Sequence, residues 1–556
     1  MEYKFLITAS GTGSRLGKLT KFLNKAIVRV GEQAAISYII DRVPQTVPIV
    51  ITVGYLGNLV RDYVMLAHPE RQIEFVEVSN YEGPGSSLGA SLMAAAEFLQ
   101  CPFIYSACDT LVFSEISPPS ENWVGLSAGN NSVEYSTAIV AQDRLVRINN
   151  KGEKDFDYVH IGLVGVKDYS SFWSRLCSLL VSAPLDSSLN DCAVINRMLE
   201  DNVAFTVRYY NDWMDIGNIN ALEQAREKIF DSFDNLEKEN EAIYLRSPNH
   251  VIKFFADSRI CVNRLKRASV LNTCVPKITG VSKNFYRYEY AEGELLSRVA
   301  NEELTDRFLS WCVVNLWKPV QLTQPSLVDF HSRCMTFYKD KTFDRVKLFQ
   351  TPLRLIDQEE YINGHLTPPL FSLLSEVDWV WLSSGTATGF HGDLHFENIL
   401  VSPDAEKGFV LVDWRQDFAG IIDFGDVYYD LAKLQHGLVV SHDMVRNNMF
   451  KINIQESAVS VGILREDRLV CCEHVFRDVV SRLGFDLLKV DILTALIYLN
   501  IAALHHHPYS QFLYYFGRYK LSHALHSHRK RLPFLKDARA ESHQMESPGI
   551  PKSGKN

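Results

Sequence analysis

Short apolar runs rich in β-branched and aromatic residues alternate with helix-patterned segments at the start of this chain, and that alternation restricts its fold more than any other feature. The predicted strands are residues 5–9, 49–53, 73–78 and 103–107, and the predicted helices are residues 34–43, 56–66 and 86–99. This pattern predicts right-handed βαβ crossovers and a mostly parallel sheet with helices on both faces, an α/β fold. Because such sheets bind ligands beyond the carboxyl ends of their strands, we expect function just after Ala9 and Ala107.

Length and composition exclude several classes of protein. The 556 residues suffice for more than one hydrophobic core, and 46% hydrophobic with 22% charged residues excludes a disordered or fibrous chain. The 57 basic and 66 acidic side chains give a net charge of −9, so no overall positive field attracts nucleic acid or anionic lipid. We expect small-molecule partners, no nucleic acid, and local basic pockets for anionic substrates.

The cysteines and the apolar runs indicate the compartment. The ten cysteines form no C-x-x-C pair and are expected to be reduced core residues. The N-terminal apolar run is too short for a signal peptide, and residues 494–504, the longest later run, contain Asn500. We expect a cytoplasmic protein without membrane insertion, and the sequence leaves homo-oligomers open.

Charge and periodicity divide the chain. Residues 1–228 form the predicted first domain, and the charged segment 229–241 is a predicted helical connector. The predicted second domain, residues 242–535, starts with two strands and becomes mostly helical from about residue 302. Residues 536–556 are polar without periodicity and are predicted to be a disordered tail.

A glycine-rich loop directly follows the first predicted strand. Gly11 and Gly13 let the backbone approach an anion with inward N–H groups, and the third glycine of a dinucleotide fingerprint is replaced by Leu16. Arg15 and Lys25 add positive charge, which suits a nucleoside triphosphate. The alternative interpretation is a tight turn with basic surface residues.

Two aspartates are candidate ligands of Mg²⁺ for such a triphosphate. Asp109 follows the predicted strand 103–107, and Asp215 opens the last helix of the first domain. If both carboxylates face the glycine-rich loop, their oxygens suit Mg²⁺. Each could instead only cap a loop.

Residues 1 to about 228 resemble the nucleotidyltransferases that activate sugar phosphates and phosphocholine, whose signature runs A-G-x-G-[ST]-R-L, P-K, a strand-end D, and W-x-D-[IT]-G. The resemblance implies a Rossmann-like doubly wound domain and carries over residue by residue. It implies a triphosphate cradle of Gly11, Gly13, Ser14 and Arg15, reacting phosphates on Lys25, metal on Asp109 and Asp215, and an acceptor phosphate on Lys151. For Lys151, a solvated turn lysine is the alternative interpretation.

This chain departs from that signature at two positions. Ser10 replaces a glycine or alanine, and Asn24 replaces the proline before Lys25, which puts the position of that lysine in doubt. Residues 82–89 lie where relatives contact the base. The base stays open between CTP, UTP and GTP.

A second constellation lies at residues 391–400, where the sequence reads H-G-D-L-H-F-E-N-I-L and is followed by a predicted strand, residues 408–412, and Asp413. Phosphoryl transfer from ATP requires a carboxylate near the incoming hydroxyl, an amide oxygen on Mg²⁺ and a second carboxylate on the metal. Asp393, Asn398 and Asp413 supply these groups at the spacing of a catalytic loop.

Residues 241 to 535 resemble the aminoglycoside phosphotransferase and choline kinase superfamily, which implies a two-lobed α+β kinase-like domain. The resemblance implies that Asp393 is the catalytic base, that Asn398 and Asp413 bind Mg²⁺, and that Asp430 caps a helix or holds a loop. Lys253 occupies the strand position of the ATP lysine. No acidic residue lies between Ser258 and Tyr288, where the family places the partner of that lysine.

Together these features predict a bifunctional enzyme. Its kinase half would phosphorylate a sugar, polyol or amino alcohol with ATP, and its first half would transfer an NMP to that phosphate, giving a precursor for surface polysaccharide. One alternative is a choline kinase that leads to CDP-choline, with an aromatic cage drawn from Tyr288, Tyr290, Trp379, Trp381, Tyr428 and Tyr429. Another is a nucleotidyltransferase with a regulatory kinase-like domain that does not catalyse.

Overall fold

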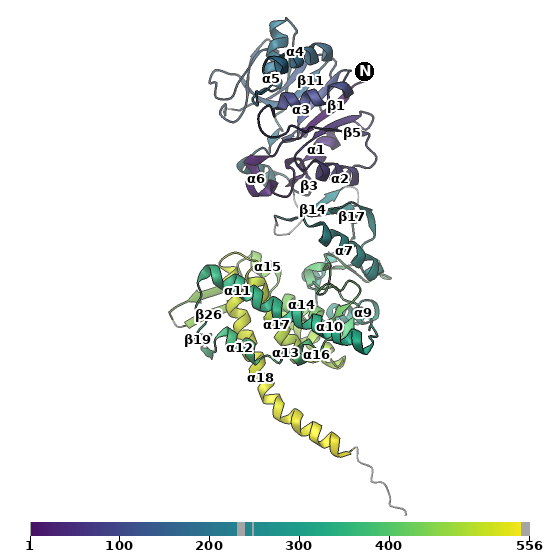
Figure 1. Cartoon of the computed structure of the whole chain (residues 1–556), viewed down its shortest axis with the longest axis vertical. Coiled ribbons are helices and arrows are strands. Elements are labelled where there is room, and N and C mark those ends of the chain that lie inside the picture. Colours follow the sequence, from purple (N-terminus) through teal and green to yellow (C-terminus); the bar gives the residue numbers. More distant parts are fainter. Residues whose placement is uncertain (1, 130, 231–238, 247–249, 457, 546–556) are drawn as a thin grey trace, which may run out of the picture. The chain divides into compact units, whose positions relative to one another are not determined.

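A nine-stranded sheet organises the first part of the chain in this computed structural model, which describes residues 2–129, 131–230, 239–246, 250–456 and 458–545 (Figure 1). In sheet order the strands are β5 (Ile73–Glu77), β4 (Ile49–Val53), β1 (Lys4–Ala9), β6 (Phe103–Ala107), β11 (Tyr158–Val166), β8 (Trp123–Ser127), β12 (Thr206–Tyr209), β10 (Arg144–Asn149) and β9 (Thr137–Ala141). The four predicted strands are confirmed as β1, β4, β5 and β6.

The prediction of a mostly parallel sheet is wrong for the second half of the sheet. Strands β5, β4, β1 and β6 are parallel, in the order 3-2-1-4 of doubly wound sheets, whereas β11 runs antiparallel to both β6 and β8. Strands β9 and β10 form a hairpin whose two central residues, Gln142 and Asp143, have φ angles of 51° and 56°. A two-residue turn with positive φ at both positions, type I′, matches the right-handed twist of the strands. The two strands are therefore joined without a helical crossover.

Alternate residues of β1 pack into two separate hydrophobic cores. Phe5 and Ile7 pack with α1 (Ala35–Arg42) and α2 (Gly57–Ala67), whereas Leu6 packs with residues of α3 (Leu88–Ala94), α4 (Tyr169–Ser182) and α5 (Asp191–Glu200). Figure 1 shows these two groups of helices on opposite sides of the sheet. Because β1 is buried on both faces, it reads as a continuous apolar run.

Short elements complete this part of the chain. They are β2 (Arg29–Val30), β3 (Gln33–Ala34), β7 (Thr110–Leu111), β13 (Met214–Asp215) and α6 (Ile219–Lys228), together with the 3₁₀ turns Ser14–Thr20, Lys25–Ile27 and Ala96–Phe98.

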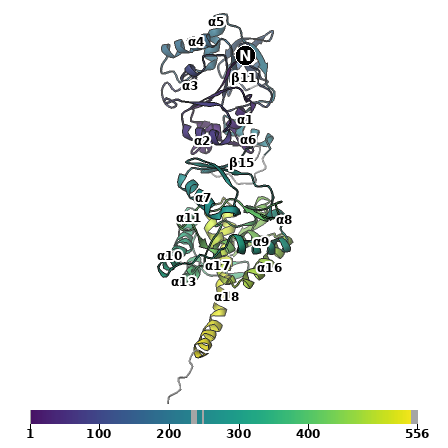
Figure 2. The same cartoon turned by 90° about the vertical axis from the view of Figure 1, so that its right-hand side faces the viewer.

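A separate four-stranded sheet shares the core of α1 and α2 (Figure 2). Its order is β14 (Glu241–Arg246), β15 (His250–Phe255), β17 (Phe285–Glu289) and β16 (Ile278–Val281). The ring of Tyr244 lies 4.8 Å from that of Tyr63, and its hydroxyl donates to the carbonyl of Ile27 at 2.7 Å. The two strands predicted at residues 242–245 and 251–255 are β14 and β15.

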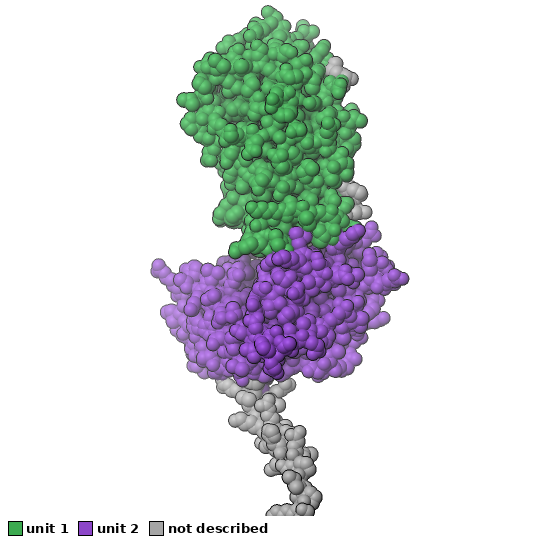
Figure 3. Space-filling view, turned by 45° about the vertical axis from the view of Figure 1, so that its right-hand side comes forward, with its two compact units in different colours: residues 1–262, 278–290 green, residues 263–277, 291–556 purple. Residues whose placement is uncertain are grey.

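The chain divides into two compact units, residues 1–262 with 278–290 and residues 263–277 with 291–556 (Figure 3). The four-stranded sheet therefore packs as part of the first unit, whereas the sequence placed the domain boundary before it. Of the predicted connector 229–241, residues 231–238 lie outside the described residues. The helix α7 (Ser258–Leu271) runs from the first unit into the second.

The second unit is mainly helical, as the sequence predicts from residue 302. Its helices are α8 (Leu296–Val299), α9 (Glu302–Asn315), α10 (Gln324–Met335), α11 (Lys341–Leu353), α12 (Leu370–Glu376), α13 (Trp379–Ser383), α14 (Val427–Val439), α15 (His442–Arg446), α16 (Asp467–Arg482), α17 (Leu487–Ala502) and α18 (Tyr509–Met545). Its strands are β18 (Glu294–Leu295), β19 (Glu360–Ile362), β20 (His365–Thr367), β21 (Ala387–Thr388), β22 (Ile399–Val401), β23 (Phe409–Leu411), β24 (Gly425–Asp426), β25 (Phe450–Ile454) and β26 (Ala458–Ile463). That this unit is kinase-like stays a prediction.

The prediction of a disordered tail from residue 536 is wrong for residues 536–545. Helix α18 continues to Met545, because residues 536–545 include good helix formers such as alanine, glutamate and arginine, and residues 546–556 lie outside the described residues. No helix in the described ranges combines the length and the apolar character that crossing a bilayer requires. Seven cysteines are buried as expected, but Cys177 and Cys471 are exposed.

A buried cation joins the small sheet to α1. The Arg246 guanidinium donates to both carboxylate oxygens of Asp41, at 2.7 and 3.0 Å, and to Gln33 Oε1 at 2.6 Å. It also faces Nδ1 of His68, whose Nε2 lies 3.0 Å from Ser37 Oγ. Burial, together with the charges of Arg246 and Arg71, lowers the pKa of His68 to about 2. His68 is therefore neutral in the native state.

We expect His68 to make the first unit less stable in acid. The unfolded histidine takes up a proton below about pH 6.5 but the native one does not, so its contribution to stability is present above pH 6.5 and is lost as pH falls. At pH 5.5 the loss is about 1.4 kcal/mol from this residue. Chemical denaturation of the wild type and of His68→Gln at pH 5.5, 6.5 and 7.5 should show a smaller pH slope in the variant. His474→Gln, at an exposed histidine, is the matched control, and equal slopes in wild type and His68→Gln would contradict the assignment.

Candidate functional sites

The loop after β1 has one glycine that packing requires and one that faces open space. Gly13 has a φ of 65°, and a Cβ there would lie 2.9 Å from Lys25 Cβ and 3.0 Å from Thr20 Cγ2. A Cβ on Gly11 would meet nothing within 4 Å. Gly13 thus lets the loop close onto Lys25, and Gly11 leaves the backbone open to a ligand.

Lys25 and Asp109 form an ion pair between the ends of β1 and β6. Lys25 Nζ lies 3.0 Å from Asp109 Oδ2, and both side chains are largely buried, at 21% and 15% exposed. Burial alone would lower the pKa of Lys25, but the Asp109 carboxylate outweighs it and raises the pKa. Burial likewise opposes ionisation of Asp109, yet the charge of Lys25 holds its pKa below the usual range. Both groups are therefore charged at neutral pH.

Asp215 lies beside Asp109 because β13 pairs with β7, opposite Thr110. The N–H of Ile216 donates to the carbonyl of Asp109 at 3.1 Å. A Cβ built on Gly217 would lie 3.1 Å from Asp215 Oδ1, 3.2 Å from Asp109 Oδ2 and 3.3 Å from Arg15 Nη2. The structure thus brings Arg15, Asp109 and Asp215 to one point, as the sequence predicted.

The two carboxylates fit a divalent cation. Burial and the charge of Asp109 raise the pKa of Asp215, which shows that the pair repels. A cation with oxygen ligands relieves such repulsion, and carboxylates are the ligands that Mg²⁺ prefers. Asp109 and Asp215 are the residues that would hold it.

Two residues support this group through contacts that the sequence did not predict. Asn24, fully buried, donates to the carbonyls of Ala9 and Tyr55 at 3.0 and 2.6 Å and accepts from the N–H of Ala26. It therefore anchors the turn that carries Lys25, in place of the expected proline. Tyr135 donates to Asp215 Oδ2 at 3.1 Å. No local pattern marks Tyr135, since it lies 80 positions from its partner.

Ser14 and Lys151 are not joined to this group. Ser14 is exposed where the 3₁₀ turn 14–20 starts, and Lys151 is exposed in the turn after β10. Within the part of the chain that the structure describes, no hydrogen bond or ion pair links Lys151 to Asp109 or Asp215. Their predicted contacts with phosphates stay predictions.

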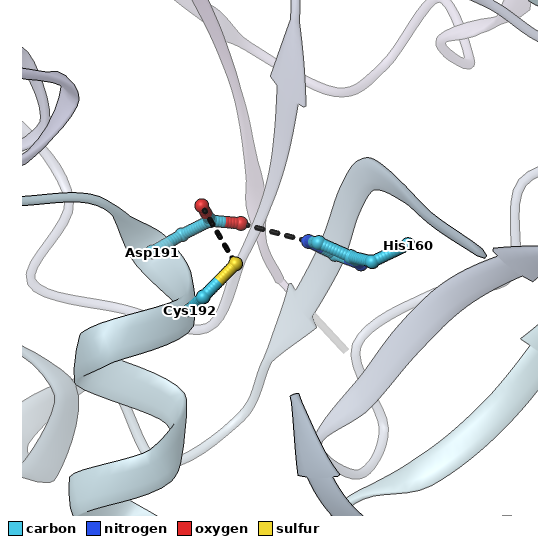
Figure 4. A group of neighbouring side chains, drawn as sticks. All are labelled: His160, Asp191 and Cys192. Atoms are coloured by element: carbon cyan, nitrogen blue, oxygen red, sulfur yellow. Dashed lines mark hydrogen bonds and ion pairs between the residues drawn. The ribbon is translucent and has the colours of Figure 1, made fainter. Parts of the chain in front are cut away.

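A third polar cluster in the first unit is closed to solvent (Figure 4). His160 Nε2 lies 2.9 Å from Asp191 Oδ2, His160 Nδ1 lies 3.3 Å from the carbonyl of Gly125, and Cys192 Sγ donates to Asp191 Oδ1 at 3.8 Å. Burial raises the pKa of the Cys192 thiol well above its ordinary value. Within the core, Asp191 is the hydrogen-bond partner of both other side chains. We therefore assign the cluster a structural role, in which it joins β11 to α5.

In the second unit, the predicted base Asp393 is paired with a buried lysine. Lys433 Nζ lies 2.7 Å from Asp393 Oδ1, and His395 Nε2 lies 3.8 Å from Asp393 Oδ2. Burial would raise the pKa of Asp393, but the charges of Lys433 and His395 lower it far below the ordinary range. Asp393 is therefore an ionised acceptor. Lys433 follows Asp430 by one helical turn, and only folding reveals its contact.

Asn398 ends the 3₁₀ turn directly before β22, and Asp413 follows β23, the strand that pairs with β22. The N–H of Val412 donates to the carbonyl of Asn398 at 2.9 Å, and Asn398 Nδ2 donates to the carbonyl of Asp393 at 2.9 Å. Asp413 has a φ of 59°, a conformation uncommon outside glycine, and forms an ion pair with Arg264. The amide oxygen of Asn398 and the carboxylate of Asp413, which pairs with the Arg264 cation, are chemically suited to Mg²⁺. These two residues would hold the ion.

Asp430 supports the loop that carries Asp393. It is fully buried and accepts from the N–H groups of His391 and Gly392 at 2.8 and 2.7 Å and from Trp317 Nε1 at 3.2 Å. Burial raises its pKa to about 6 despite these donors. The predicted loop-holding role is confirmed.

Helix α7 supplies two arginines to the loops of the second unit. Besides Arg264, the buried Arg267 donates to the carbonyls of Phe390 and Ile422, the latter at 2.9 Å. Burial lowers the pKa of Arg267 to about 10, so it stays charged. Lys253, the predicted ATP lysine, is buried on β15 in the first unit. Its predicted role stays a prediction.

No family model and no curated protein matches this chain. Its N-terminal part is similar to solved structures at low sequence identity. The CTP:phosphocholine cytidylyltransferase from Streptococcus pneumoniae has 18% identity and a TM-score of 0.36, covering 41% of this chain and 99% of its own. The inositol-1-phosphate CTP transferase from T. maritima has 17% identity and a TM-score of 0.33, covering 41% and 98%. The UDP-glucose pyrophosphorylase from Acinetobacter baumannii has 16% identity and a TM-score of 0.34, covering 41% and 92%.

We expect Asn24→Ala to destabilise the first unit by about 2–4 kcal/mol, because two buried carbonyls lose their donor. Thermal and chemical denaturation measure the change. Asn80→Ala removes the amide of an exposed asparagine that donates to Pro84 O at 3.4 Å, and it should cost less than about 0.5 kcal/mol. Equal stability of the two variants would contradict an anchoring role for Asn24.

Proposed function

We propose that this chain is a bifunctional cytoplasmic enzyme, a nucleotidyltransferase joined to a small-molecule kinase. One observation supports it most: Arg15, Lys25, Asp109 and Asp215 meet at the carboxyl ends of β1 and β6, where doubly wound sheets bind ligands. The second unit adds the loop of Asp393, Asn398 and Asp413. The phosphorylated product of one reaction would be the substrate of the other, giving an NDP-activated precursor for surface polysaccharide.

In the nucleotidyl transfer, a phosphate oxygen of the acceptor forms a bond to the α-phosphorus of CTP, UTP or GTP. The bond from that phosphorus to the bridging oxygen breaks, and pyrophosphate leaves. Arg15 and Lys25 would hold the phosphates in line through charge, since little covalent chemistry is needed from the protein. Mg²⁺ on Asp109 and Asp215 would supply further charge neutralisation.

In the phosphoryl transfer, the hydroxyl oxygen of the acceptor forms a bond to the γ-phosphorus of ATP, and ADP leaves. Asp393 Oδ2 accepts the hydroxyl proton, because Oδ1 is held by Lys433 at 2.7 Å. Asp430 keeps the loop in place through two backbone donors. Asn398 and Asp413 would hold Mg²⁺ for charge neutralisation.

The choline alternative is disfavoured by the aromatic residues that a cage would need. Lys489 Nζ lies 4.9 Å from the ring centre of Tyr428 and 5.5 Å from that of Trp381. Lys341 Nζ lies 5.7 Å from that of Tyr429. The protein's own cations thus occupy faces that would bind a quaternary ammonium. The intact set of Asp393, Asn398 and Asp413 disfavours a kinase-like unit that only regulates.

Substitutions should separate the two reactions. We expect Asp109→Asn to lower nucleotidyl transfer about a hundredfold and leave ATP-dependent phosphorylation unchanged, because one carboxylate ligand of the Mg²⁺ that would neutralise the reacting phosphates is lost. Asp393→Asn should lower phosphorylation by about 10²–10⁴-fold and leave nucleotidyl transfer to a supplied phosphorylated acceptor intact. Mass spectrometry of products from Mg²⁺, ATP, CTP, UTP, GTP and a pool of hydroxyl compounds measures both.

Each failure has its own meaning in that experiment. A monophosphate that never receives a nucleotide would remove the transferase proposal. Nucleotidylation of supplied phosphates without any ATP turnover would leave the kinase-like unit as a regulator.

Lys433 should act by positioning Asp393 and lowering its pKa. In Lys433→Met the pKa of Asp393 rises, so the acid limb of the pH profile of kcat/KM should move to higher pH and the rate at pH 7 should fall at least tenfold, roughly the effect of one lost buried ion pair. Lys433→Arg, which keeps the positive charge, should retain most of the wild-type rate. A parallel loss of rate at every pH, with no shift of the acid limb, would indicate a structural role only.

A further inference from the structure

Cationic side chains gather around the catalytic loop of the second unit. The side chain of Arg415 lies on Gly392, since a Cβ there would come within 2.6 Å of Arg415 Cβ and 3.1 Å of its Cδ. The N–H of Arg415 donates to the carbonyl of His391 at 3.0 Å. Arg415 is thus adjacent to Asp393, which already has its own cation in Lys433 at 2.7 Å.

An aromatic platform carries a second cation next to Arg415. Phe337, Phe418 and Tyr429 are buried, with ring centres 4.5 Å (Phe337 to Phe418) and 4.9 Å (Phe337 to Tyr429) apart. Arg415 Cζ lies 5.0 Å from the centre of Phe337 and Lys341 Nζ lies 4.1 Å from it. Two positive groups therefore share one ring, beside the residue proposed to accept the hydroxyl proton.

A third positive side chain, Arg345, adjoins Lys341. Arg345 lies one helical turn after Lys341 on α11. In the described ranges no carboxylate forms a salt bridge with Lys341, Arg345 or Arg415. Burial, then the charges of Arg415, Lys433 and Arg345, lowers the pKa of Lys341 well below its ordinary value, against the opposing charge of Asp393. Such repulsion is relieved when an anion binds.

We propose that the compound phosphorylated at Asp393 is a hydroxy compound that carries an anionic group, a carboxylate or a phosphate, bound by Lys341, Arg345 and Arg415. This inference rests on the proposed kinase activity and narrows its substrate class. Guanidinium groups form paired hydrogen bonds with such planar or tetrahedral oxyanions. A cationic acceptor would be repelled by the same side chains.

The test uses the full chain with Mg²⁺ and ATP and measures ADP release. Acceptors are offered in matched sets that differ in charge: glycerol, glycerate and 3-amino-1,2-propanediol; ribitol, ribonate and ribitol phosphate; and choline. The best acceptor should be an anion, with kcat/KM roughly 10- to 100-fold above its neutral partner, the range expected for one or two charged hydrogen bonds. A neutral or cationic best acceptor overturns the inference and leaves the proposed kinase activity standing.

Variants distinguish binding of the acceptor from binding of ATP. Lys341→Gln with Arg345→Gln should raise KM for the anionic acceptor roughly 10- to 100-fold while KM for ATP changes less than about twofold. Lys347→Gln, at an exposed residue of the same helix, removes one charge and should change neither constant. A rise in KM for ATP alone would show that these cations bind the nucleotide, which overturns the inference.

A binding measurement decides the case in which no offered compound is phosphorylated. Sulfate should raise the melting temperature of the wild type saturably, and the Lys341→Gln and Arg345→Gln double variant should lose part of that rise. Lys25→Ala, in the other unit, serves as control for sulfate bound at the first site. Equal sulfate response of the wild type and the double variant would overturn the inference. ADP release that persists in Asp393→Asn would instead contradict the proposed kinase site itself.

Discussion

Burial of β1 on both faces determines the architecture of the first unit. Neighbouring residues of this strand enter different cores, Ile7 toward α1 and α2 and Leu6 toward α3, α4 and α5, so no face is left for solvent. Its two neighbours, β4 and β6, run parallel to it and are reached through helical crossovers. The carboxyl ends of β1 and β6 then lie side by side. Lys25 and Asp109 meet there, and neither charge would be tolerated at such burial without the other.

The two units handle buried charge in similar ways. In the first, Asp109 and Asp215 are held close enough to repel, with Lys25 and Arg15 as the nearby cations. In the second, Lys433 holds Asp393, and the fully buried Asp430 accepts two backbone donors of the same loop. Both arrangements hold ionised oxygens that the proposed phosphate chemistry would use to bind a metal or to accept a proton. Further positive side chains, around Lys341 and Arg415, lie outside these pairs. They support the proposed binding of a negatively charged ligand there.

Local patterns sufficed for the elements that are buried on one or two regular faces. The strands β1, β4, β5, β6, β14 and β15 were predicted within about two residues, since β-branched runs and turn residues mark their ends. The strand at residues 158–166 was predicted and is β11, but its antiparallel pairing was not, because periodicity does not report a short hairpin or a mixed strand order. The packing of the four-stranded sheet onto α2 was missed for the same reason. Tyr244 and Tyr63 become neighbours only after folding.

The sequence by itself determined which chemistry this chain can carry: glycines where a backbone must approach a ligand, aspartates at strand ends, and the spacing of Asp393, Asn398 and Asp413. These signals are short-range, and single positions or loops contain them. Tertiary structure alone decided which partners those groups have. Contacts join Asn24 to Tyr55 over 31 positions and Tyr135 to Asp215 over 80. Ion pairs join Lys433 to Asp393 over 40 positions and Arg264 to Asp413 over 149. Contacts at such separations depend on how strands and helices pack, and no local pattern contains that information.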